Sequence, residues 1–277
     1  MKQDILVGAV CFQEYHGSYL EFLDLAAELN LHWVELKYEP PICLRNGSGR
    51  FQEIRRKAAD SGIGLSLHTP FVGLNIASFD TGERTLSINR IKDSLTAASG
   101  MGIRAATVHS GFLRAVDYSA DNWKKSKELN ISGLRELSGF SRDLGITLCL
   151  ENGNAFKVGQ IKHALHPGAM KAIRREVGEP LGFTVDFGHA MYFSRNPSYL
   201  ISELNPDNVK LSHLHSNNQL EDSHSPLGNG LLQYKSVMAQ YAAEKWRFPL
   251  SLEMKSESDL RTSVDVVNSC ISELEML

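Results

Sequence analysis

Short apolar segments recur eight times along the chain, separated by stretches with helical periodicity. The segments are 5–12, 32–38, 64–70, 105–110, 146–152, 182–188, 209–216 and 248–255. Strands that are almost wholly apolar are typical of a parallel sheet covered by helices, and their number suits closure into a (β/α)8 barrel, an α/β fold. An open, doubly wound sheet is the alternative.

Helix boundaries between these segments carry start and stop signals. Ser18 and Glu21 form the pattern of a capping box, which predicts the start of a helix. Gly145 follows a long periodic stretch and is expected to end another helix.

Residues with catalytic or metal-binding chemistry fall at or near the carboxyl ends of the predicted strands. They are Glu35, His68, His109, Glu151, Asp186, His213 and Glu253. Barrel enzymes place their active sites at that end, whereas an open sheet gathers its ligands at one switch point. This distribution favours the barrel.

Length and composition fit a single barrel domain over residues 1–277. Lys and Arg number 29 against 32 Asp and Glu, and the net charge of −3 weakens a nucleic-acid-binding role. The four cysteines are scattered, which is typical of reduced thiols in a cytosolic protein. Because neither a secretory signal nor an apolar span of about 18 residues occurs, we expect a cytoplasmic protein without a membrane partner. A homo-oligomer is compatible with these features.

The stretch 211–230 concentrates metal-ligand chemistry. Within twelve residues it holds three histidines and an aspartate, which are His213, His215, Asp222 and His224. Imidazole and carboxylate groups bind divalent ions such as zinc or manganese. Gly228 and Gly230 follow in a tight turn whose N–H groups are suited to a close approach to an anion or a hydroxyl. A lone strand-end histidine is more often a packing residue, but four such groups together favour a metal site.

Carboxylates end two further strands. Glu151 and Glu253 each close an otherwise apolar run, where an unpaired buried carboxylate is costly unless a cation or metal lies beside it. Asp186 and His189 stand three residues apart at the end of the sixth strand, so one turn can aim both inward.

Sequence pieces around these residues resemble the xylose-isomerase-like barrel superfamily, which includes sugar isomerases, epimerases and abasic-site nucleases of the endonuclease IV type. The matching pieces span nearly the whole chain and are LSLHTPF, LNIAS, ATVHSG, LCLEN, TVDFGHA, SHLHSN, DSHSPLGNG and LSLEMK. The resemblance implies a divalent metal cofactor, zinc or manganese, with one to three ions.

The resemblance also implies the ligands. The metal site shared by the sugar enzymes maps to Glu151, Asp186, His213 and Glu253. The ligands that give the nuclease branch three zinc ions map in addition to His68, His109, His189, Asp222 and His224. In that arrangement one ion lies at His68, His109 and Glu151, and Glu151 bridges to the ion of the sugar-enzyme site. The third ion lies at His189, Asp222 and His224.

Other parts of the chain depart from the nuclease pattern. Glu35 is more typical of the sugar branch, and the connection from His213 to Asp222 is shorter than the nuclease loop that touches DNA. The loops of the predicted mouth offer few cations, namely Arg45, Arg50, Arg114 and Arg195. Because a protein that grips duplex DNA neutralises several phosphates, we expect only weak, salt-sensitive DNA binding.

The favoured hypothesis is a metal-dependent isomerase or epimerase of a small sugar or sugar phosphate. Glu151 and Glu253 would be catalytic, removing and returning a proton next to the carbonyl through an enediolate. Substrate contacts are expected from Glu35, His189, His215, Gly228, Gly230 and Lys255. One alternative is an endonuclease IV-like zinc phosphodiesterase acting on abasic-site DNA, and another is a non-catalytic, metal-stabilised binding protein.

Overall fold

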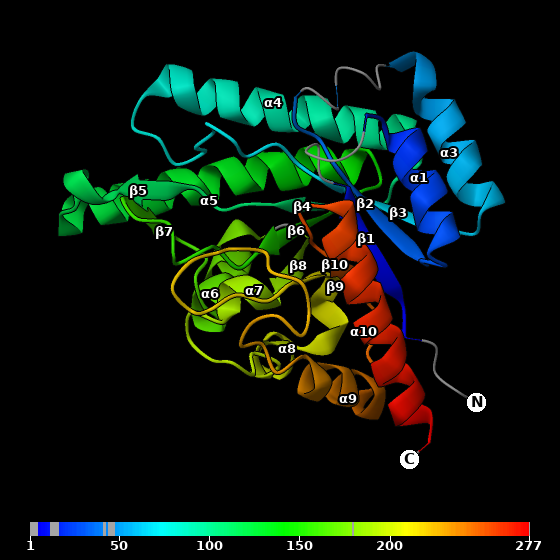
Figure 1. Cartoon of the computed structure of the whole chain (residues 1–277). Helices are drawn as coiled ribbons and strands as arrows, with labels where there is room; N and C mark the ends of the chain where they lie inside the picture. The colour runs from blue at the N-terminus through cyan, green and yellow to red at the C-terminus, as the bar shows by residue number, and fades with distance from the viewer. Residues whose placement is uncertain (1–4, 12–16, 41–42, 44–47, 179, 277) are drawn as a thin grey trace.

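Eight parallel strands close into a barrel, which confirms the (β/α)8 prediction and excludes the open sheet (Figure 1). The computed structural model describes residues 5–11, 17–40, 43, 48–178 and 180–276, so residue 12 and Arg45 lie outside the described part. The barrel strands are β1 (Val7–Cys11), β2 (Trp33–Lys37), β3 (Gly64–His68), β4 (Ala105–Val108), β6 (Thr147–Glu151), β8 (Leu181–Asp186), β9 (Val209–Leu214) and β10 (Leu250–Leu252). Strand β1 pairs with both β2 and β10, so the last strand meets the first.

Helices cover the outside of this ring (Figure 1). They are α1 (Tyr19–Glu28), α3 (Phe51–Asp60), α4 (Thr81–Gly100), α5 (Ala120–Asp143), α6 (Pro167–Val177), α8 (Tyr199–Leu204), α9 (Tyr234–Glu244) and α10 (Glu257–Glu275). The short helix α7 (Phe187–Ala190) lies instead at the carboxyl end of β8. Two boundary predictions are confirmed. The Ser18 hydroxyl accepts a hydrogen bond from the Glu21 N–H at 3.3 Å, and Gly145 adopts a left-handed φ of 71° just after α5.

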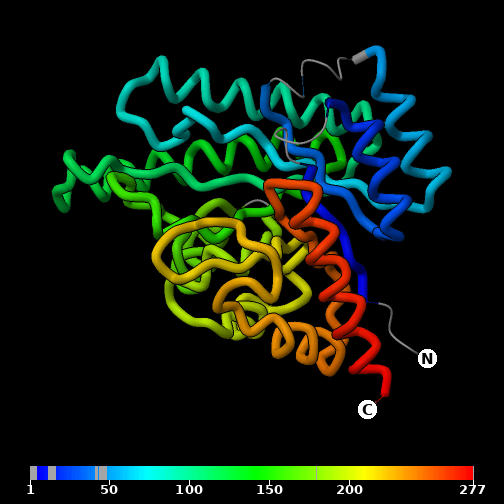
Figure 2. The backbone as a smooth tube through the Cα atoms, in the orientation of Figure 1, coloured from blue at the N-terminus to red at the C-terminus, as the bar shows by residue number. Residues whose placement is uncertain are grey.

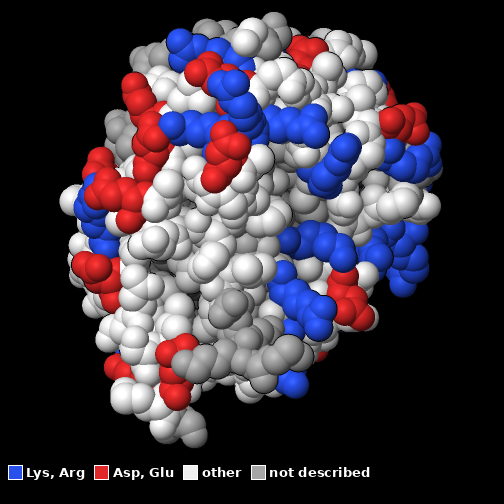
Figure 3. All heavy atoms as spheres, turned by 90° about the vertical axis from the view of Figure 1, so that its right-hand side faces the viewer, with Lys and Arg blue, Asp and Glu red and all other residues white. Residues whose placement is uncertain are grey.

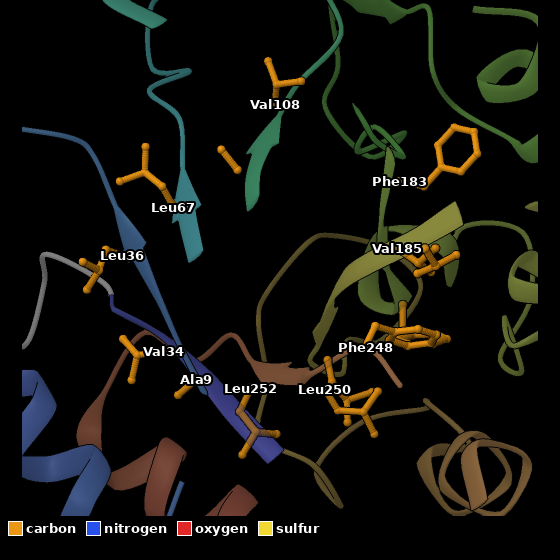
Figure 4. Close-up of a cluster of buried hydrophobic side chains, with 14 of the residues drawn as sticks. Ala9, Val34, Leu36, Leu67, Val108, Phe183, Val185, Phe248, Leu250 and Leu252 are labelled. Atoms are coloured by element: carbon orange, nitrogen blue, oxygen red, sulfur yellow. The ribbon is translucent and has the colours of Figure 1, made fainter. Parts of the chain in front are cut away.

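Polar side chains line the inside of the barrel, while apolar side chains of the same strands face the helices. Thr107 and Thr184 share a hydrogen bond of 3.0 Å although β4 and β8 are not neighbours in the sheet, so both point inward. Because side chains alternate along a strand, the residues next to inward positions point outward. Figure 4 shows Val34, Leu36 and Leu67 among these apolar side chains. Each strand thus presents apolar residues to the helices and polar residues to the barrel interior, whereas we expected strands that are apolar on both sides.

Connections at the carboxyl ends of the strands build the walls of the barrel mouth. A two-stranded antiparallel sheet, β5 (Phe112–Arg114) and β7 (Gln160–Lys162), forms from the chain that leaves β4 and β6, and the sequence did not predict it. The long connection between β9 and α9, yellow to orange in Figure 2, carries Asp222 and His224.

Three further observations concern the cysteines, the character of the helices and the charges on the surface. Cys11, Cys43, Cys149 and Cys270 are buried and form no disulfide within the described residues, in agreement with the reduced thiols that their spacing predicted. Within the described ranges, no helix combines the length and apolar character needed to cross a bilayer. Basic and acidic side chains both occur on the face drawn in Figure 3, so one sign of charge does not cover that face.

Candidate metal centre

The predicted metal ligands converge at the carboxyl end of the barrel. Parallel strands all end on one side of a barrel, so groups at their ends meet there. Strand pairing sets Asp186 opposite His213, and His213 opposite Ser251, which precedes Glu253 by two residues. A cavity of about 290 Å³ opens above this point, and its walls include His68, His109, Glu151, His189, Asp222, His224 and Glu253.

Glu151 lies between two groups of imidazole nitrogens. Its Oε2 atom is 2.5 Å from His109 Nε2 and 3.7 Å from His68 Nε2. Its Oε1 atom is 2.9 Å from His213 Nδ1. The Nδ1 atom of His68 lies 2.9 Å from the carbonyl oxygen of Thr69, which fixes the ring with Nε2 toward Glu151. The two oxygens of this carboxylate therefore face two adjacent groups of imidazoles, the position in which the resemblance predicts a bridging ligand.

His213 Nδ1 faces a set of carboxylates. Besides Glu151, Glu253 Oε2 lies 3.3 Å away and Asp186 Oδ2 lies 3.7 Å away. The opposite nitrogen, Nε2, lies 3.0 Å from Glu35 Oε1. Glu35 Oε2 in turn accepts a hydrogen bond of 3.0 Å from Ser66 Oγ. This chain of contacts leaves Nδ1 as the nitrogen available to a metal.

Asp222 joins a third group. Its Oδ2 atom lies 3.4 Å from His189 Nε2 and 3.3 Å from His224 Nε2. The two histidines nevertheless belong to different sets of close ligand atoms, so the predicted third set of His189, Asp222 and His224 stays a prediction. His215 lies in this group as well. Its Nε2 is 3.2 Å from Asp186 Oδ1, and its ring stacks on that of His224 with a centroid distance of 3.9 Å. The sequence places His215 both in the metal-ligand stretch and among the expected substrate contacts, and its role stays a prediction.

Local backbone features aim these rings. Asp186 caps α7 by accepting a hydrogen bond of 2.7 Å from the N–H of His189, which confirms that one turn carries both residues. The Nδ1 atom of His189 lies 3.0 Å from the carbonyl oxygen of Asn152, and this contact turns Nε2 toward Asp222. A Cβ at Gly188 would overlap the ring of His215, so only glycine leaves room for that ring.

The charges of the groups depend on one another. Burial works against the charged form of His189, but Asp186 and Asp222 outweigh it and raise the pKa of His189 to about 10. Burial likewise opposes charge on His213, and Glu35 and Glu253 nevertheless hold its pKa well above the usual value. Protons on these rings thus balance the carboxylates in the metal-free protein.

Other members of the site keep the charge states that metal ligands need. Burial would raise the pKa of Asp222, but the charge of His189 outweighs it and the pKa lies well below its usual range. Burial lowers the pKa of His109 to about 4, so its ring is neutral at pH 7.

The residues fit divalent ions. Four sets of three side chains each place one ligand atom apiece within 4.8 Å of one another: His68, His109 and Glu151; Glu151, Asp186 and His213; Asp186, His189 and His215; and His215, His224 and Glu253. Two buried polar atoms of the site, His215 Nδ1 and Asp222 Oδ1, have no hydrogen-bond partner among the described residues. Buried polar atoms are rarely left unpaired, and bound cations would satisfy such acceptors.

The predicted substrate contacts are distributed unevenly. His189 and Lys255 line the cavity. Glu35 and His215 are fully buried among the ligands instead of standing in the cavity wall. Gly228 and Gly230 also lie outside the wall, and Gly230 leaves space for the side chain of Ser216, which a Cβ would overlap. Contact of the two glycines with substrate stays a prediction.

Sequence reasoning missed three lysines and an asparagine of the cavity wall, which are Lys37, Lys157, Lys162 and Asn154. Asn154 donates a hydrogen bond of 2.7 Å to Asp222 Oδ2 and so helps to fix a ligand. Lys37 had a detectable signal, because it is a charged residue that ends an otherwise buried strand. Lys162 depends on the pairing of β5 and β7, which has no such signal.

Comparisons with known proteins agree with this architecture. An uncharacterised protein of Methanocaldococcus jannaschii is 25% identical over 225 residues, which cover 78% of this chain and 75% of the relative. A crystal structure described as a D-tagatose 3-epimerase-like protein superposes with a TM-score of 0.80 at 21% identity, over 95% of this chain and 99% of that one. A structure of a Thermus thermophilus protein, described as soaked with ZnCl2, superposes with a TM-score of 0.73 at 24% identity. The match covers 97% of this chain and 99% of that one.

The two structures bear on the fold, and the assignment to a family rests on the sequence. The sequence profile described as xylose isomerase-like TIM barrel matches residues 23–270, which include all the barrel strands except β1. The chain therefore belongs to the xylose isomerase-like TIM barrel family.

Proposed function

We propose that the chain is a divalent-metal-dependent isomerase or epimerase of a small sugar or sugar phosphate. One observation carries the proposal. Glu151 and Glu253 flank the same nitrogen of His213, at 2.9 and 3.3 Å, and both carboxylates line the cavity. A substrate held above that nitrogen would have a carboxylate on each side, which is the arrangement that proton transfer to and from carbon needs.

The chain's own groups supply the proton transfer. Burial would raise the pKa of Glu151, but the close contact with the His109 ring and the contact with the charged ring of His213 outweigh it and hold the pKa well below the usual value, so the carboxylate is ionised and can accept a proton. One carboxylate takes the proton from the carbon next to the carbonyl, and the electron pair moves onto the carbonyl oxygen to give an enediolate. A proton returned to the former carbonyl carbon, with the hydroxyl proton of the adjacent carbon passing to the former carbonyl oxygen, completes an isomerisation. A proton returned to the opposite face of the original carbon completes an epimerisation. A divalent ion at the centre would supply the charge that stabilises the enediolate.

Cavity size and fold support a small substrate. The cavity of about 290 Å³ lies at the lower end of the range of about 300–1,000 Å³ that is usual for small-molecule sites. Similarity to a D-tagatose 3-epimerase-like structure is consistent with a sugar, although it concerns the fold. The Thermus thermophilus structure soaked with ZnCl2 makes zinc the first ion to test, with manganese second.

A zinc phosphodiesterase acting on abasic-site DNA is the second candidate, and a specific observation favours it. His68 and His109 on one side, and Asp222 and His224 on the other, add two ligand groups to the set needed for one ion. Several ions together can neutralise the charge of a phosphodiester during hydrolysis.

Isotope exchange separates the two candidates. The metal-loaded protein is incubated in D₂O with a panel of aldoses, ketoses and their phosphates, and deuterium is followed by NMR. We expect deuterium at the carbon next to the carbonyl of at least one substrate, and its loss in Glu253→Gln. An abasic-site duplex is tested in parallel. Efficient incision of the duplex, with no deuterium in any sugar, would replace the isomerase with the nuclease.

A further inference from the structure

Lysines crowd the wall of the cavity above the metal ligands. Lys37, Lys157, Lys162 and Lys255 all line it, and they come from β2, from the connection after β6, from β7 and from the segment after β10. Four separate parts of the chain thus bring ammonium groups to one small cavity. Lys37 is buried, Lys162 is half-buried, and Lys157 and Lys255 are exposed. Their convergence from four segments of the chain on one cavity suggests a ligand.

The existing contacts of Lys157, Lys162 and Lys255 leave the charge of these three lysines largely uncompensated. Lys37, whose residue is 8% exposed, has its Nζ atom 3.8 Å from Glu253 Oε1 and 5.0 Å from the ring centroid of Phe71. In the part of the chain that the structure describes, Lys157, Lys162 and Lys255 have no carboxylate oxygen within 4.0 Å. Their ammonium groups are therefore available to an anion.

Lys162 is the most constrained of the three. Its residue is half-buried, and its Nζ atom lies 5.4 Å from the ring centroid of Phe112, its pairing partner across the β5–β7 sheet. Burial, and next the charge of Lys157, lower the pKa of Lys162 to about 8. Like-charged groups kept together in this way are stabilised by an anion between them.

Charge balance leads to the same point. Six carboxylates lie at the centre or in the cavity wall, namely Glu35, Glu39, Glu151, Asp186, Asp222 and Glu253. Three divalent ions would balance these six negative charges. The four lysines would then make the loaded cavity positive, which favours an anionic substrate.

We infer that Lys37, Lys157, Lys162 and Lys255 form a subsite for a phosphate group, so the substrate is a phosphorylated sugar rather than a neutral one. This inference rests on the proposed function, whose chemistry it makes more specific. A phosphate monoester carries nearly two negative charges and three acceptor oxygens, which match several ammonium donors. A sugar carboxylate carries a single charge and would leave most of these lysines without a partner.

Binding measurements test the inference without relying on turnover. The metal-loaded full chain is titrated by calorimetry with aldose and ketose phosphates of five and six carbons, each paired with its neutral sugar. We expect at least one phosphate to bind tenfold or more tightly than its neutral partner. Lys162→Gln and Lys255→Gln should each weaken that binding by about tenfold, as the loss of a charge-assisted hydrogen bond implies, while the metal content and the affinity for the neutral sugar stay unchanged.

Lys210→Gln is the matched control, because Lys210 lies near the amino end of β9, where its Nζ donates to the carbonyl of Asp207 at 2.7 Å. This variant should bind as the wild type does. The inference is overturned if no pair shows a preference for the phosphate, or if both cavity variants keep wild-type affinity. Deuterium exchange confined to neutral sugars would refute the phosphate subsite but would leave the proposed isomerase function standing. Lysine-dependent binding of a sugar phosphate, without deuterium exchange in any sugar, would support the phosphate subsite but would refute the proposed isomerase function.

Discussion

Glu35 and His213 meet inside the barrel through a contact of 3.0 Å between Oε1 and Nε2, and both residues are fully buried. Strands β2 and β9 are not neighbours in the sheet, so this contact crosses the barrel interior. Ser66 and Trp33 extend it, because Trp33 Nε1 donates to Ser66 Oγ at 2.9 Å and Ser66 donates to Glu35. A carboxylate behind a metal-binding histidine fixes the tautomer and strengthens the ligand.

Replacing Glu35 with Gln should therefore weaken metal binding although Glu35 would touch no ion. Gln keeps the volume of the side chain but lacks its charge, and the loss of such a partner weakens affinity by about 10- to 100-fold. Competition with a chelating dye measures the change. Glu136→Gln is the control, because Glu136 lies on α5 and pairs with Lys92 at the surface, away from the metal ligands. Equal affinities for wild type and Glu35→Gln would assign Glu35 a packing role.

Loss of a direct ligand should have a larger effect. Metal at about 100 times its dissociation constant should stabilise the fold by about 2.7 kcal/mol and raise the melting temperature by several degrees. Glu151→Gln and His213→Ala should each lower affinity by about tenfold or more and reduce that rise. Thermal melts with and without zinc or manganese provide the test. If both variants keep the full rise, these residues are not ligands.

Metal affinity should increase with pH. A bound ion must displace the protons that His189 and His213 carry in the metal-free protein, because the pKa values of both rings are raised. Affinity should then rise by about tenfold per pH unit for each displaced proton between pH 6 and 8. Metal titrations at several pH values measure this slope, which gives the number of protons displaced. The variant His189→Gln should displace one proton fewer than the wild type. A slope of zero in the wild type would show that these rings are not protonated before metal binds.

The same shifts predict how the stability of the metal-free protein depends on pH. A histidine with a raised pKa in the folded state contributes stability that is complete below about pH 6.5 and is lost as pH rises through the folded pKa, about 10 for His189. The free energy of unfolding should fall between pH 6.5 and 8, a window that ends where Lys162 begins to titrate. The exposed residue His32 offers a control, since His32→Gln should keep the slope. A flat profile would contradict the assigned charges.

The sequence was sufficient for the barrel and for the general position of the site. The apolar segments and the helical periodicity between them identified the strands. In a parallel barrel the carboxyl ends of all strands lie on one side, so Glu151 and Asp186 had to lie near one another. The depth of a residue within the barrel was harder to predict. Glu35 precedes Lys37 by two residues on β2, which places it one layer deeper, beneath the ligands instead of at the wall.

The remaining differences depend on tertiary contacts that leave no local pattern. The ring of His215 reaches the third group because Gly188, distant in sequence, has no Cβ. Lys162 reaches the cavity because β7 pairs with β5. Such placements follow from how loops pack, and neither periodicity nor residue spacing encodes them.

The number of bound ions per chain tests the central claim, a preformed metal centre at the barrel mouth, most directly. The protein is loaded with excess zinc, dialysed and measured by elemental analysis, and the positions are located by anomalous scattering from crystals. We predict an ion beside His213, with further ions beside His109 and beside His224, and their separate loss in His109→Ala and His224→Ala. A single ion would restrict the centre to the ligands shared with the sugar enzymes. No bound ion in the wild type, after loading with either zinc or manganese, would contradict the account.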